Sequence, residues 1–342
     1  MIKIGINGFG RIGRAIFKIN QKNKYFKIVC VNDIDPDLKN MLYLLKYDST
    51  YGKYDKNVKF IDDNNFSVDG DLIKYSSEDY IENVDWSNSD VIICASGIKK
   101  NIEGARNLLN KNIIKKAVVT HASNLVDQTI IMGVNENEYD GHKQNLISSS
   151  ICDANAVAQA LYHVDNQWGI KNCFFTTLHP WLSYQNLVDG TIKSVSSPGH
   201  FWRDYALGRS STESMIPKLT TASDAVSNVL PQFKNKIKAI SFRTPTAIVS
   251  SSDMTITCDK MIMADEVKEY FKGLAENNTY LGYNEESLTS IDYKQNEHSS
   301  IIDGQWVNVL DDNVLKLIVW YDNEWGYSAR VVDVVRLVSG IL

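Results

Sequence analysis

The chain has 342 residues, which is enough for two domains with separate hydrophobic cores. Hydrophobic residues make up 44% and charged residues 23%, the composition of an ordinary globular protein. The net charge of −5 argues against a nucleic-acid-binding surface. No apolar run approaches the roughly 20 residues that span a membrane. We therefore expect neither a nucleic-acid nor a membrane partner.

The five cysteines are odd in number and scattered along the chain, which does not fit a disulfide framework. Their spacing also does not match a metal site, so the sequence predicts no metal ion. Free thiols are typical of a reducing compartment. The chain starts directly with the strand-like segment Ile2–Ile6, which leaves no room for a signal peptide. These features predict a cytoplasmic protein.

Residues 1–150 alternate strand-like and helix-like segments. Apolar runs rich in Val and Ile predict buried strands, and apolar residues at helical spacing predict the helices between them. This alternation is typical of a parallel sheet with helices on both faces, so we predict an α/β domain of the Rossmann type. The expected strands are Ile2–Ile6, Lys27–Val31, Asp90–Cys94, Lys116–Thr120 and Ile130–Val134, and the expected helices are Arg11–Asn20 and one that contains Leu108 and Leu109.

Residues 151–325 follow a different pattern, with one early helix and then longer strands. The helix is expected from about Ala154 to Asn166, ended by Gly169. Long strands after a single helix predict an α+β domain with a largely antiparallel sheet. Residues 326–342 form a terminal helix, apolar over Val331–Val338, that we expect to join the first domain. The expected strands are Cys173–Leu178, Ile237–Phe242, Ala247–Thr257 and Val314–Trp320.

A glycine-rich turn joins the first strand to the first helix. Gly8, Gly10 and Gly13 have the G-x-G-x-x-G spacing, in which the glycines permit a tight turn, close approach of a pyrophosphate and close helix packing. The pyrophosphate would meet the N–H groups at the helix start. Asp33 follows about 20 residues later, where a carboxylate binds a ribose 2′-hydroxyl and repels a 2′-phosphate. The sequence therefore predicts NAD as cofactor; the alternative is an ordinary strand–helix turn with a solvated Asp33.

Cys152 and His179 are the candidate chemical residues. Cys152 lies just before the helix expected from Ala154, and a helix N-terminus stabilises a thiolate. The strand Cys173–Leu178 leads directly to His179, a residue type that serves as base or acid. The alternative is a small buried Cys152 and a structural His179. The remaining cysteines, in or beside apolar strands, are assigned to packing: Cys30, Cys94, Cys173 and Cys258.

Five blocks of the sequence resemble the glyceraldehyde-3-phosphate dehydrogenase family. They follow the family's order and extend over nearly the whole chain, which makes the resemblance highly specific. The blocks are Gly5–Arg14, Leu45–Ser49, Met132–Asn135, Phe242–Thr246 and Trp320–Tyr327.

The resemblance implies roles for individual residues. Cys152 falls on the family's nucleophile and His179 on its base. The thiolate would add to an aldehyde, His179 would take the hydroxyl proton, and a thioester would remain on Cys152 for attack by inorganic phosphate. A homotetramer is also implied, with the long loop Asn186–Arg209 reaching a neighbouring subunit's cofactor. The implied NAD contacts come from Arg11, Ile12, Asp33, Thr120 and Asn323.

The phosphate-binding positions depart from the family's pattern. The family places hydroxyl residues around its cysteine, in a Ser-Cys-Thr-Thr-Asn run, whereas this chain has Ile151, Asp153 and Ala154. Leu182 replaces a Thr after the histidine. Asp153 would repel a phosphate by about 1 kcal/mol at 4 Å in water and about 4 kcal/mol in a half-buried site. The substrate-binding candidates are Asp153, Arg209, Thr220, Thr221 and Arg243, of which Thr220-Thr221 stands where the family has Thr-Gly.

Asp153 also allows a second interpretation, since an Asp is a good helix N-cap and suits a first turn. Near the thiol, its charge would tend to raise the pKa of Cys152. The sequence therefore allows two roles for Asp153, a helix cap and a residue that alters the phosphate site.

Three functions remain open. The first is a phosphorylating glyceraldehyde-3-phosphate dehydrogenase with unusual phosphate sites. The second is a relative that oxidises another aldehyde, with water as acyl acceptor; Thr120–Ala122 and His298–Gly304 resemble the family's erythrose-4-phosphate subgroup. The third is an NAD-binding sensor or scaffold without turnover, which would need neither Cys152 nor His179. We favour an active NAD-dependent aldehyde dehydrogenase.

Overall fold

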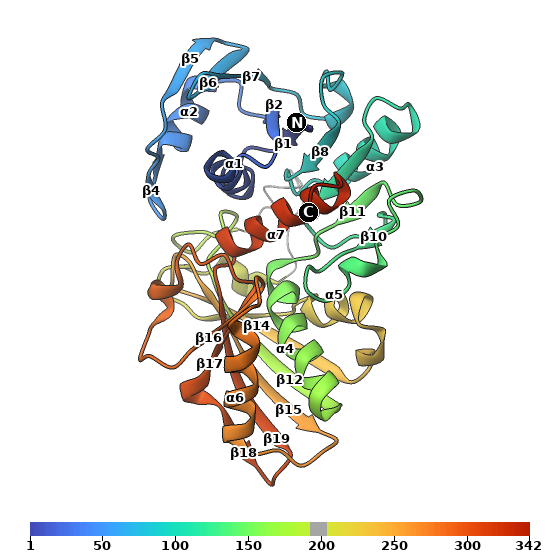
Figure 1. The fold of residues 1–342 in the computed structure, drawn as a ribbon. Coiled ribbons are helices and arrows are strands. Elements are labelled where there is room, and N and C mark those ends of the chain that lie inside the picture. Colours follow the sequence, from blue (N-terminus) through green and yellow to red (C-terminus); the bar gives the residue numbers. More distant parts are fainter. Residues whose placement is uncertain (192–203) are drawn as a thin grey trace. The chain divides into compact units, whose positions relative to one another are not determined.

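The computed structural model describes residues 1–191 and 204–342, and the predicted loop Asn186–Arg209 lies partly outside them. The chain divides into two compact units (Figure 1). The first comprises Met1–Ile130, Glu136–Ser150 and Ser328–Leu342, and the second comprises Ile131–Asn135 and Ile151–Tyr327. No helix in the described ranges combines the length and apolar character needed to cross a membrane.

The first unit is built on a sheet that is parallel from β10 to β7 and antiparallel at the β7-β6-β5 edge. Its strand order is β10-β11-β9-β8-β1-β2-β7-β6-β5. The central strands carry apolar side chains on both faces because helices cover them, as expected for a Rossmann-type sheet. The strands are β1 Lys3–Asn7, β2 Lys27–Asn32, β5 Val58–Asp62, β6 Asn65–Val68, β7 Asp71–Ser76, β8 Val91–Cys94, β9 Lys116–Val119, β10 Gln128–Thr129 and β11 Leu146–Ser148, and a separate ribbon pairs β3 Tyr47–Asp48 with β4 Gly52–Lys53.

Helices of the first unit connect these strands. The predicted α1 and α3 are present, whereas α2 was not predicted. The last helix, α7, starts in the second unit and continues in the first. The helices are α1 Arg11–Asn23, α2 Leu38–Lys46, α3 Lys99–Asn110 and α7 Trp325–Val338, with short 3₁₀ turns at η1 Ile81–Asn83 and η2 Glu136–Glu138.

The predicted strand Ile130–Val134 is wrong. This apolar run is fully buried at Ile130, Ile131 and Met132, but it forms a turn rather than a strand. Gly133 has a φ of +83°, and the Asn135 side chain accepts a hydrogen bond from the Ile131 N–H at 2.8 Å. Beside β9, on the edge opposite β8, lies β11, a segment of only three residues that the sequence pattern did not reveal. Burial of a short run does not by itself distinguish a strand from a buried turn.

The second unit has a mostly antiparallel sheet, as predicted. Its order is β13-β14-β12-β15-β19-β17-β16, with β18 paired to β19, and the pairs β12/β14 and β16/β17 are parallel. The strands are β12 Ile170–Pro180, β13 Ile216–Lys218, β14 Ile237–Thr244, β15 Ser250–Cys258, β16 Leu281–Asn284, β17 Ser300–Asp303, β18 Asn308–Leu310 and β19 Val314–Tyr321.

A long helix, α4, packs across the strands β12, β15, β17 and β19 of this sheet and contacts α5 beside it (Figure 1). Its residues Ala154, Val157, Leu161 and Val164 are completely buried, which fixes the start of the helix over the sheet. The helices are α4 Cys152–Trp168, α5 Ala222–Val229 and α6 Ala264–Ala275, and the 3₁₀ turns are η3 Tyr205–Gly208, η4 Pro231–Phe233, η5 Ser290–Tyr293 and η6 Gly304–Trp306.

Candidate active site

The glycine-rich turn of the first unit has the geometry that the fingerprint requires. Gly8 has a φ of +98°, and a Cβ there would lie 2.5 Å from the Ser96 nitrogen. A Cβ on Gly13 would lie 2.1 Å from the Gly8 carbonyl oxygen, so a side chain is excluded there too. A Cβ on Gly10, by contrast, meets no atom within 4 Å. The turn therefore needs two glycines for its own packing, and the third leaves the backbone beside the helix start open to a ligand.

Asp33 follows β2 and holds the same turn. Its Oδ2 accepts a 2.6 Å hydrogen bond from the Phe9 N–H. Arg11, at the start of α1, pairs with Asp48 at 3.1 Å and Ile12 is half-buried. Asp33 and Arg11 thus lie at the turn and at the helix start where the fingerprint predicts the dinucleotide.

Two further predicted cofactor residues lie on different units. Thr120 follows β9 in the first unit, where its N–H and its hydroxyl both donate to the Cys94 carbonyl at 3.1 Å. Asn323 follows β19 in the second unit and is only 5% exposed. Within the described residues, the Asn323 Oδ1 has no hydrogen-bond partner. A buried amide oxygen without a partner is costly, and it suits a site that a ligand completes.

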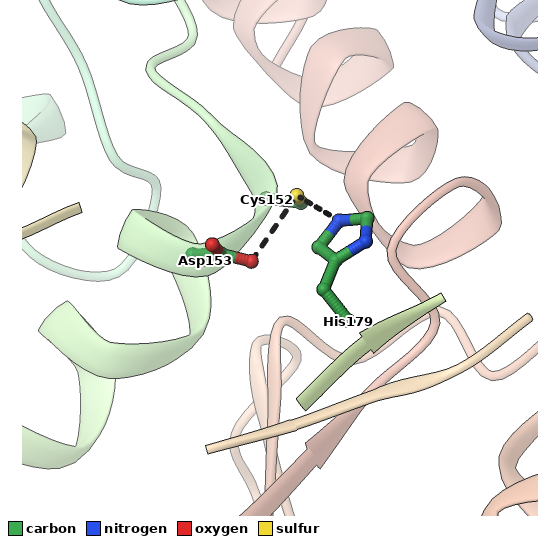
Figure 2. A group of neighbouring side chains, drawn as sticks. All are labelled: Cys152, Asp153 and His179. Atoms are coloured by element: carbon green, nitrogen blue, oxygen red, sulfur yellow. Dashed lines mark hydrogen bonds between the residues drawn. The ribbon is translucent and has the colours of Figure 1, made fainter. Parts of the chain in front are cut away.

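Cys152, Asp153 and His179 come together in the second unit (Figure 2). Cys152 and Asp153 are the first two residues of α4, and His179 lies near the end of β12. The Cys152 Sγ lies 3.7 Å from the His179 Nε2 and 3.5 Å from the Asp153 Oδ1. Cys152 keeps partial exposure, while Asp153 and His179 are buried. The structure thus brings the two predicted catalytic side chains into direct contact.

The backbone before α4 aims the thiol at this contact. Ser150 adopts a φ of +61°, in the left-handed region that residues with a side chain rarely occupy. Such strain is often found beside functional groups. The helix then begins at Cys152, two residues earlier than predicted, so the thiol belongs to the first helical turn.

The ring of His179 has a defined tautomer. Its Nδ1 lies 2.8 Å from the Pro180 carbonyl oxygen, which can only accept a hydrogen bond. In the neutral ring the proton is therefore on Nδ1. The Nε2 lone pair consequently faces the Cys152 sulfur, where it can accept a proton.

Burial dominates the protonation of both groups. It raises the pKa of Cys152 well above its ordinary value, the adjacent Asp153 raises it further, and Arg243 opposes them. Burial, and then Arg243, lowers the pKa of His179 to about 4. The free pair at neutral pH is therefore a thiol beside a neutral imidazole. Proton transfer from sulfur has to accompany attack on a substrate.

Asp153 lies in the first turn of α4, as the second interpretation expected, but it is not the N-cap residue, so the capping role is wrong. The N-cap residue is Ile151, which makes no side-chain capping bond. The Asp153 Oδ1 accepts a 2.8 Å hydrogen bond from the Tyr321 hydroxyl. Its carboxylate is 6% exposed and lies beside the thiol. Asp153 thus belongs to the same cluster of side chains as Cys152 and His179 at the start of α4.

The predicted substrate residues separate into two sets. Arg243, near the end of β14, is buried and close enough to act electrostatically on Cys152 and His179. Its guanidinium donates a 3.4 Å hydrogen bond to the Tyr184 hydroxyl. Arg209 pairs with Asp189 at 2.7 Å and is mostly exposed.

The two threonines lie at the start of α5. Thr221 is its N-cap residue, and the Thr220 hydroxyl accepts a hydrogen bond from the Ala222 N–H at 3.2 Å. Of the predicted substrate residues, Asp153 contacts the thiol, and Arg243 lies opposite His179 in the β12/β14 pairing.

Tyr321 was not assigned a role from the sequence. Burial alternates strictly along β19, so that Leu315, Leu317, Val319 and Tyr321 all face inward. The sequence shows no such alternation, because the strand is apolar at every position except Lys316, so the buried face of Tyr321 emerges only in the structure. What the pattern could not show is that α4, far away in the chain, places Asp153 against it.

Two family models match this chain. Residues 2–102 match the family model described as glyceraldehyde 3-phosphate dehydrogenase, NAD binding domain, and residues 151–323 match the model of its C-terminal domain. The first match confirms the predicted cofactor, NAD.

Similar curated proteins extend over nearly the whole chain. The chain is 36% identical to "Glyceraldehyde-3-phosphate dehydrogenase" of Priestia megaterium and to "Glyceraldehyde-3-phosphate dehydrogenase 1" of Bacillus subtilis, over 99% of this chain and 98% of each relative. It is 35% identical to "Glyceraldehyde-3-phosphate dehydrogenase" of Salmonella typhimurium, over 99% of both chains.

Proposed function

Because this chain belongs to the glyceraldehyde-3-phosphate dehydrogenase family, we propose that it oxidises a small sugar aldehyde or sugar-phosphate aldehyde through a thioester on Cys152. The observation that carries the proposal is the 3.7 Å contact between the Cys152 Sγ and the unprotonated Nε2 of His179. A nucleophile beside a base that is itself held by a third group is the arrangement of covalent catalysis. A binding protein without turnover would need neither residue.

The cofactor residues have distinct roles in this proposal. Gly8, Gly10 and Gly13 shape the turn for the pyrophosphate, and Asp33 binds the ribose hydroxyls. Arg11, Ile12 and Thr120 are further proposed NAD contacts, and the buried amide oxygen of Asn323 is proposed as an acceptor for the cofactor. NAD, when bound, supplies the electron-pair acceptor for the oxidation.

Side chains of this protein carry out the proton transfers of the reaction. As the Cys152 sulfur bonds to the aldehyde carbon, its proton passes to the His179 Nε2 and from there to the new oxygen. His179 then removes that hydroxyl proton when the adduct is oxidised, and the acyl group stays on sulfur as a thioester. The Cys152 N–H and the His179 ring stabilise the oxyanion on the way.

The acyl acceptor distinguishes two candidate functions. Inorganic phosphate would release an acyl phosphate, and water would release a carboxylic acid. The buried Asp153 carboxylate, 3.5 Å from sulfur, supports water because it repels an anion and can accept a proton from a neutral nucleophile. The flanking Ile151 offers phosphate no side-chain hydrogen bond. We therefore propose weak or no dependence on inorganic phosphate.

The substrate residues follow from the same reasoning. Arg243 is proposed to bind the anionic or hydroxyl-rich part of the aldehyde, since its charge acts directly on the reacting pair. Arg209, Thr220 and Thr221 remain proposals for a second anion position.

We also propose a cytoplasmic homotetramer. Phe174 on β12 is 68% exposed and Ile240 on β14 is 49% exposed, although both belong to the central sheet of the second unit. Exposed apolar residues on a sheet face favour burial against another copy. Light scattering coupled to size-exclusion chromatography tests this, with Phe174→Glu expected to lower the mass to that of a smaller species.

The central experiment is an aldehyde panel assayed for NADH with and without inorganic phosphate. It includes glyceraldehyde 3-phosphate, erythrose 4-phosphate and unphosphorylated glyceraldehyde. NADH formation that does not change with phosphate supports water as acceptor. A steep and saturable phosphate requirement with glyceraldehyde 3-phosphate would establish the phosphorylating reaction instead. Tight NAD binding with no thioester burst on any aldehyde would contradict catalysis.

A further inference from the structure

Three side chains of types that commonly bind metal ions lie close together at the start of α4. We propose that Cys152, Asp153 and His179 form a binding site for Zn²⁺, with one ligand atom from each residue. Their ligand atoms all lie within 4.8 Å of one another. This inference does not depend on the proposed oxidation, because it concerns the side chains as they stand (Figure 2).

The distances fit a tetrahedral ion. Zinc binds thiolate sulfur at ~2.3 Å and imidazole nitrogen or carboxylate oxygen at ~2.0–2.2 Å, which places tetrahedral ligand atoms roughly 3.3–3.8 Å apart. The Sγ–Oδ1 separation is 3.5 Å and the Sγ–Nε2 separation is 3.7 Å. Two of the three edges therefore already have the required length. The third edge, from Nε2 to the carboxylate, is within 4.8 Å and would shorten on binding.

The ligand atoms are also oriented for coordination. The His179 Nδ1–H donates to the Pro180 carbonyl at 2.8 Å, which leaves the Nε2 lone pair directed at the site. A metal-binding histidine usually makes such a bond to a carbonyl or carboxylate with its other nitrogen. The Tyr321 hydroxyl donates a 2.8 Å hydrogen bond to the Asp153 Oδ1, the same oxygen that lies 3.5 Å from the sulfur, and so holds the carboxylate at its ligand atom. Two of the three ligands thus have the outer hydrogen bonds that fix a metal site.

The charges favour a divalent cation. On binding, the Cys152 thiol loses one proton to the solvent and a Zn–S bond replaces S–H. Thiolate and carboxylate together then neutralise the two charges of the ion. Arg243 and Lys218, whose charges reach His179, act against binding. The thiolate and the carboxylate are both used to neutralise the ion, so a neutral residue at position 153 would add one uncompensated positive charge to those of Arg243 and Lys218.

Thiolate and imidazole together select zinc over magnesium or calcium, which prefer oxygen ligands. Three protein ligands also leave a fourth position for water, as in open zinc sites. The scattered cysteines gave no metal-ligand spacing because the three ligands come from a helix start and a distant strand. A bound ion would occupy both the Cys152 sulfur and the His179 nitrogen, so it would reversibly block the nucleophile.

The test is direct binding of Zn²⁺ and of Co²⁺ as a spectroscopic substitute. Zn²⁺ affinity is measured by competition with a chromophoric chelator, and Co²⁺ should give thiolate charge-transfer absorption together with the intense visible bands of a four-coordinate ion. We expect one ion per chain. Tyr321→Phe should lower the Zn²⁺ affinity roughly tenfold to a hundredfold. Asp153→Asn, which keeps the shape of the side chain, should lower the Zn²⁺ affinity by more than that.

Controls separate this site from unspecific thiol binding. Cys152→Ser keeps the other four cysteines and should abolish the charge-transfer band, whereas Cys258→Ala should keep it. Circular dichroism confirms that each variant is folded. Unchanged Zn²⁺ affinity in folded Asp153→Asn would overturn the three-ligand site in favour of a Cys–His pair, and a spectrum without thiolate absorption would overturn it entirely. Binding with no aldehyde oxidation would refute only the proposed function.

Discussion

The Tyr321 hydroxyl donates a 2.8 Å hydrogen bond to the Asp153 carboxylate oxygen that also lies 3.5 Å from the Cys152 sulfur. A buried carboxylate with such a donor is held in place beside the nucleophile. It is therefore positioned to influence the protonation of the thiol and the choice of the acyl acceptor. The first three predictions concern this group.

Replacing Asp153 by Thr should make Cys152 react with iodoacetamide at lower pH. Burial raises the pKa of the thiol most and Asp153 raises it further, so removing the carboxylate lowers the pKa while burial keeps it above the ordinary value. The measurement is the alkylation rate against pH in buffer with EDTA. Asp265→Thr, at the same second position of α6 but 95% exposed, is the matched control and should leave the profile unchanged. A profile that does not move in Asp153→Thr would refute the electrostatic role of this residue.

The same Asp153→Thr substitution should increase the dependence of NADH formation on inorganic phosphate. A neutral hydroxyl no longer repels the anion, which removes a penalty of about 4 kcal/mol in a half-buried site. Initial rates across a phosphate series give the change in kcat/KM for phosphate. No gain in the folded variant would show that other positions, such as Ile151 and Leu182, limit phosphate binding.

Tyr321→Phe should destabilise the protein by about 1–3 kcal/mol, since it leaves a buried carboxylate without its donor. The melting temperature by calorimetry measures the loss. Tyr283→Phe is the control, because that hydroxyl bonds the exposed Glu285 and its removal should stay within about 0.5 kcal/mol. An equal loss of melting temperature in the two variants would mean that the Tyr321–Asp153 hydrogen bond stabilises the protein no more than an exposed one.

Cys152→Ser should lower kcat by on the order of 10³-fold or more, because a neutral hydroxyl is a far weaker nucleophile and the residues of such a group act together. Steady-state NADH formation and mass spectrometry of the acyl-enzyme are the measurements. Cys258→Ala removes a buried thiol from β15 and should retain turnover. Normal activity of Cys152→Ser would eliminate the thioester mechanism.

Gly10→Ala should lower NAD affinity, whereas Gly13→Ala should lower the stability of the protein. The Gly10 Cβ meets open space, so the melting temperature should hold while NAD binding weakens roughly tenfold or more, about 1.4 kcal/mol. The Gly13 Cβ would lie 2.1 Å from the Gly8 carbonyl, so this variant should lose about 1–3 kcal/mol of stability. Calorimetry and fluorescence titration with NADH separate the two effects. Unchanged NADH affinity in Gly10→Ala would mean that the cofactor backbone does not approach this residue.

The fold class, the NAD fingerprint and the family could all be predicted from the sequence. These depend on local order: glycine spacing, the strand–helix alternation and an acid at the end of the second strand, all of which are set by neighbours along the chain. Burial of the other four cysteines was also predictable, because they lie in apolar strands. The wrong strand prediction also came from a local pattern. The turn at Ile130–Val134 was mistaken for a strand because burial alone makes a run apolar.

The contacts of Asp153 could not be predicted in this way and depend on the three-dimensional packing of the chain. Its place in a first turn was compatible with a simple cap, and nothing nearby in the sequence excluded that. The packing of α4 against β19 brings the Tyr321 hydroxyl, 168 residues away, onto the carboxylate, while β12 brings His179 to the sulfur. Contacts between such distant segments depend on how a helix lies on a sheet, which no local pattern encodes. Cys152 was identifiable from sequence, but its protonation and its neighbours follow from packing.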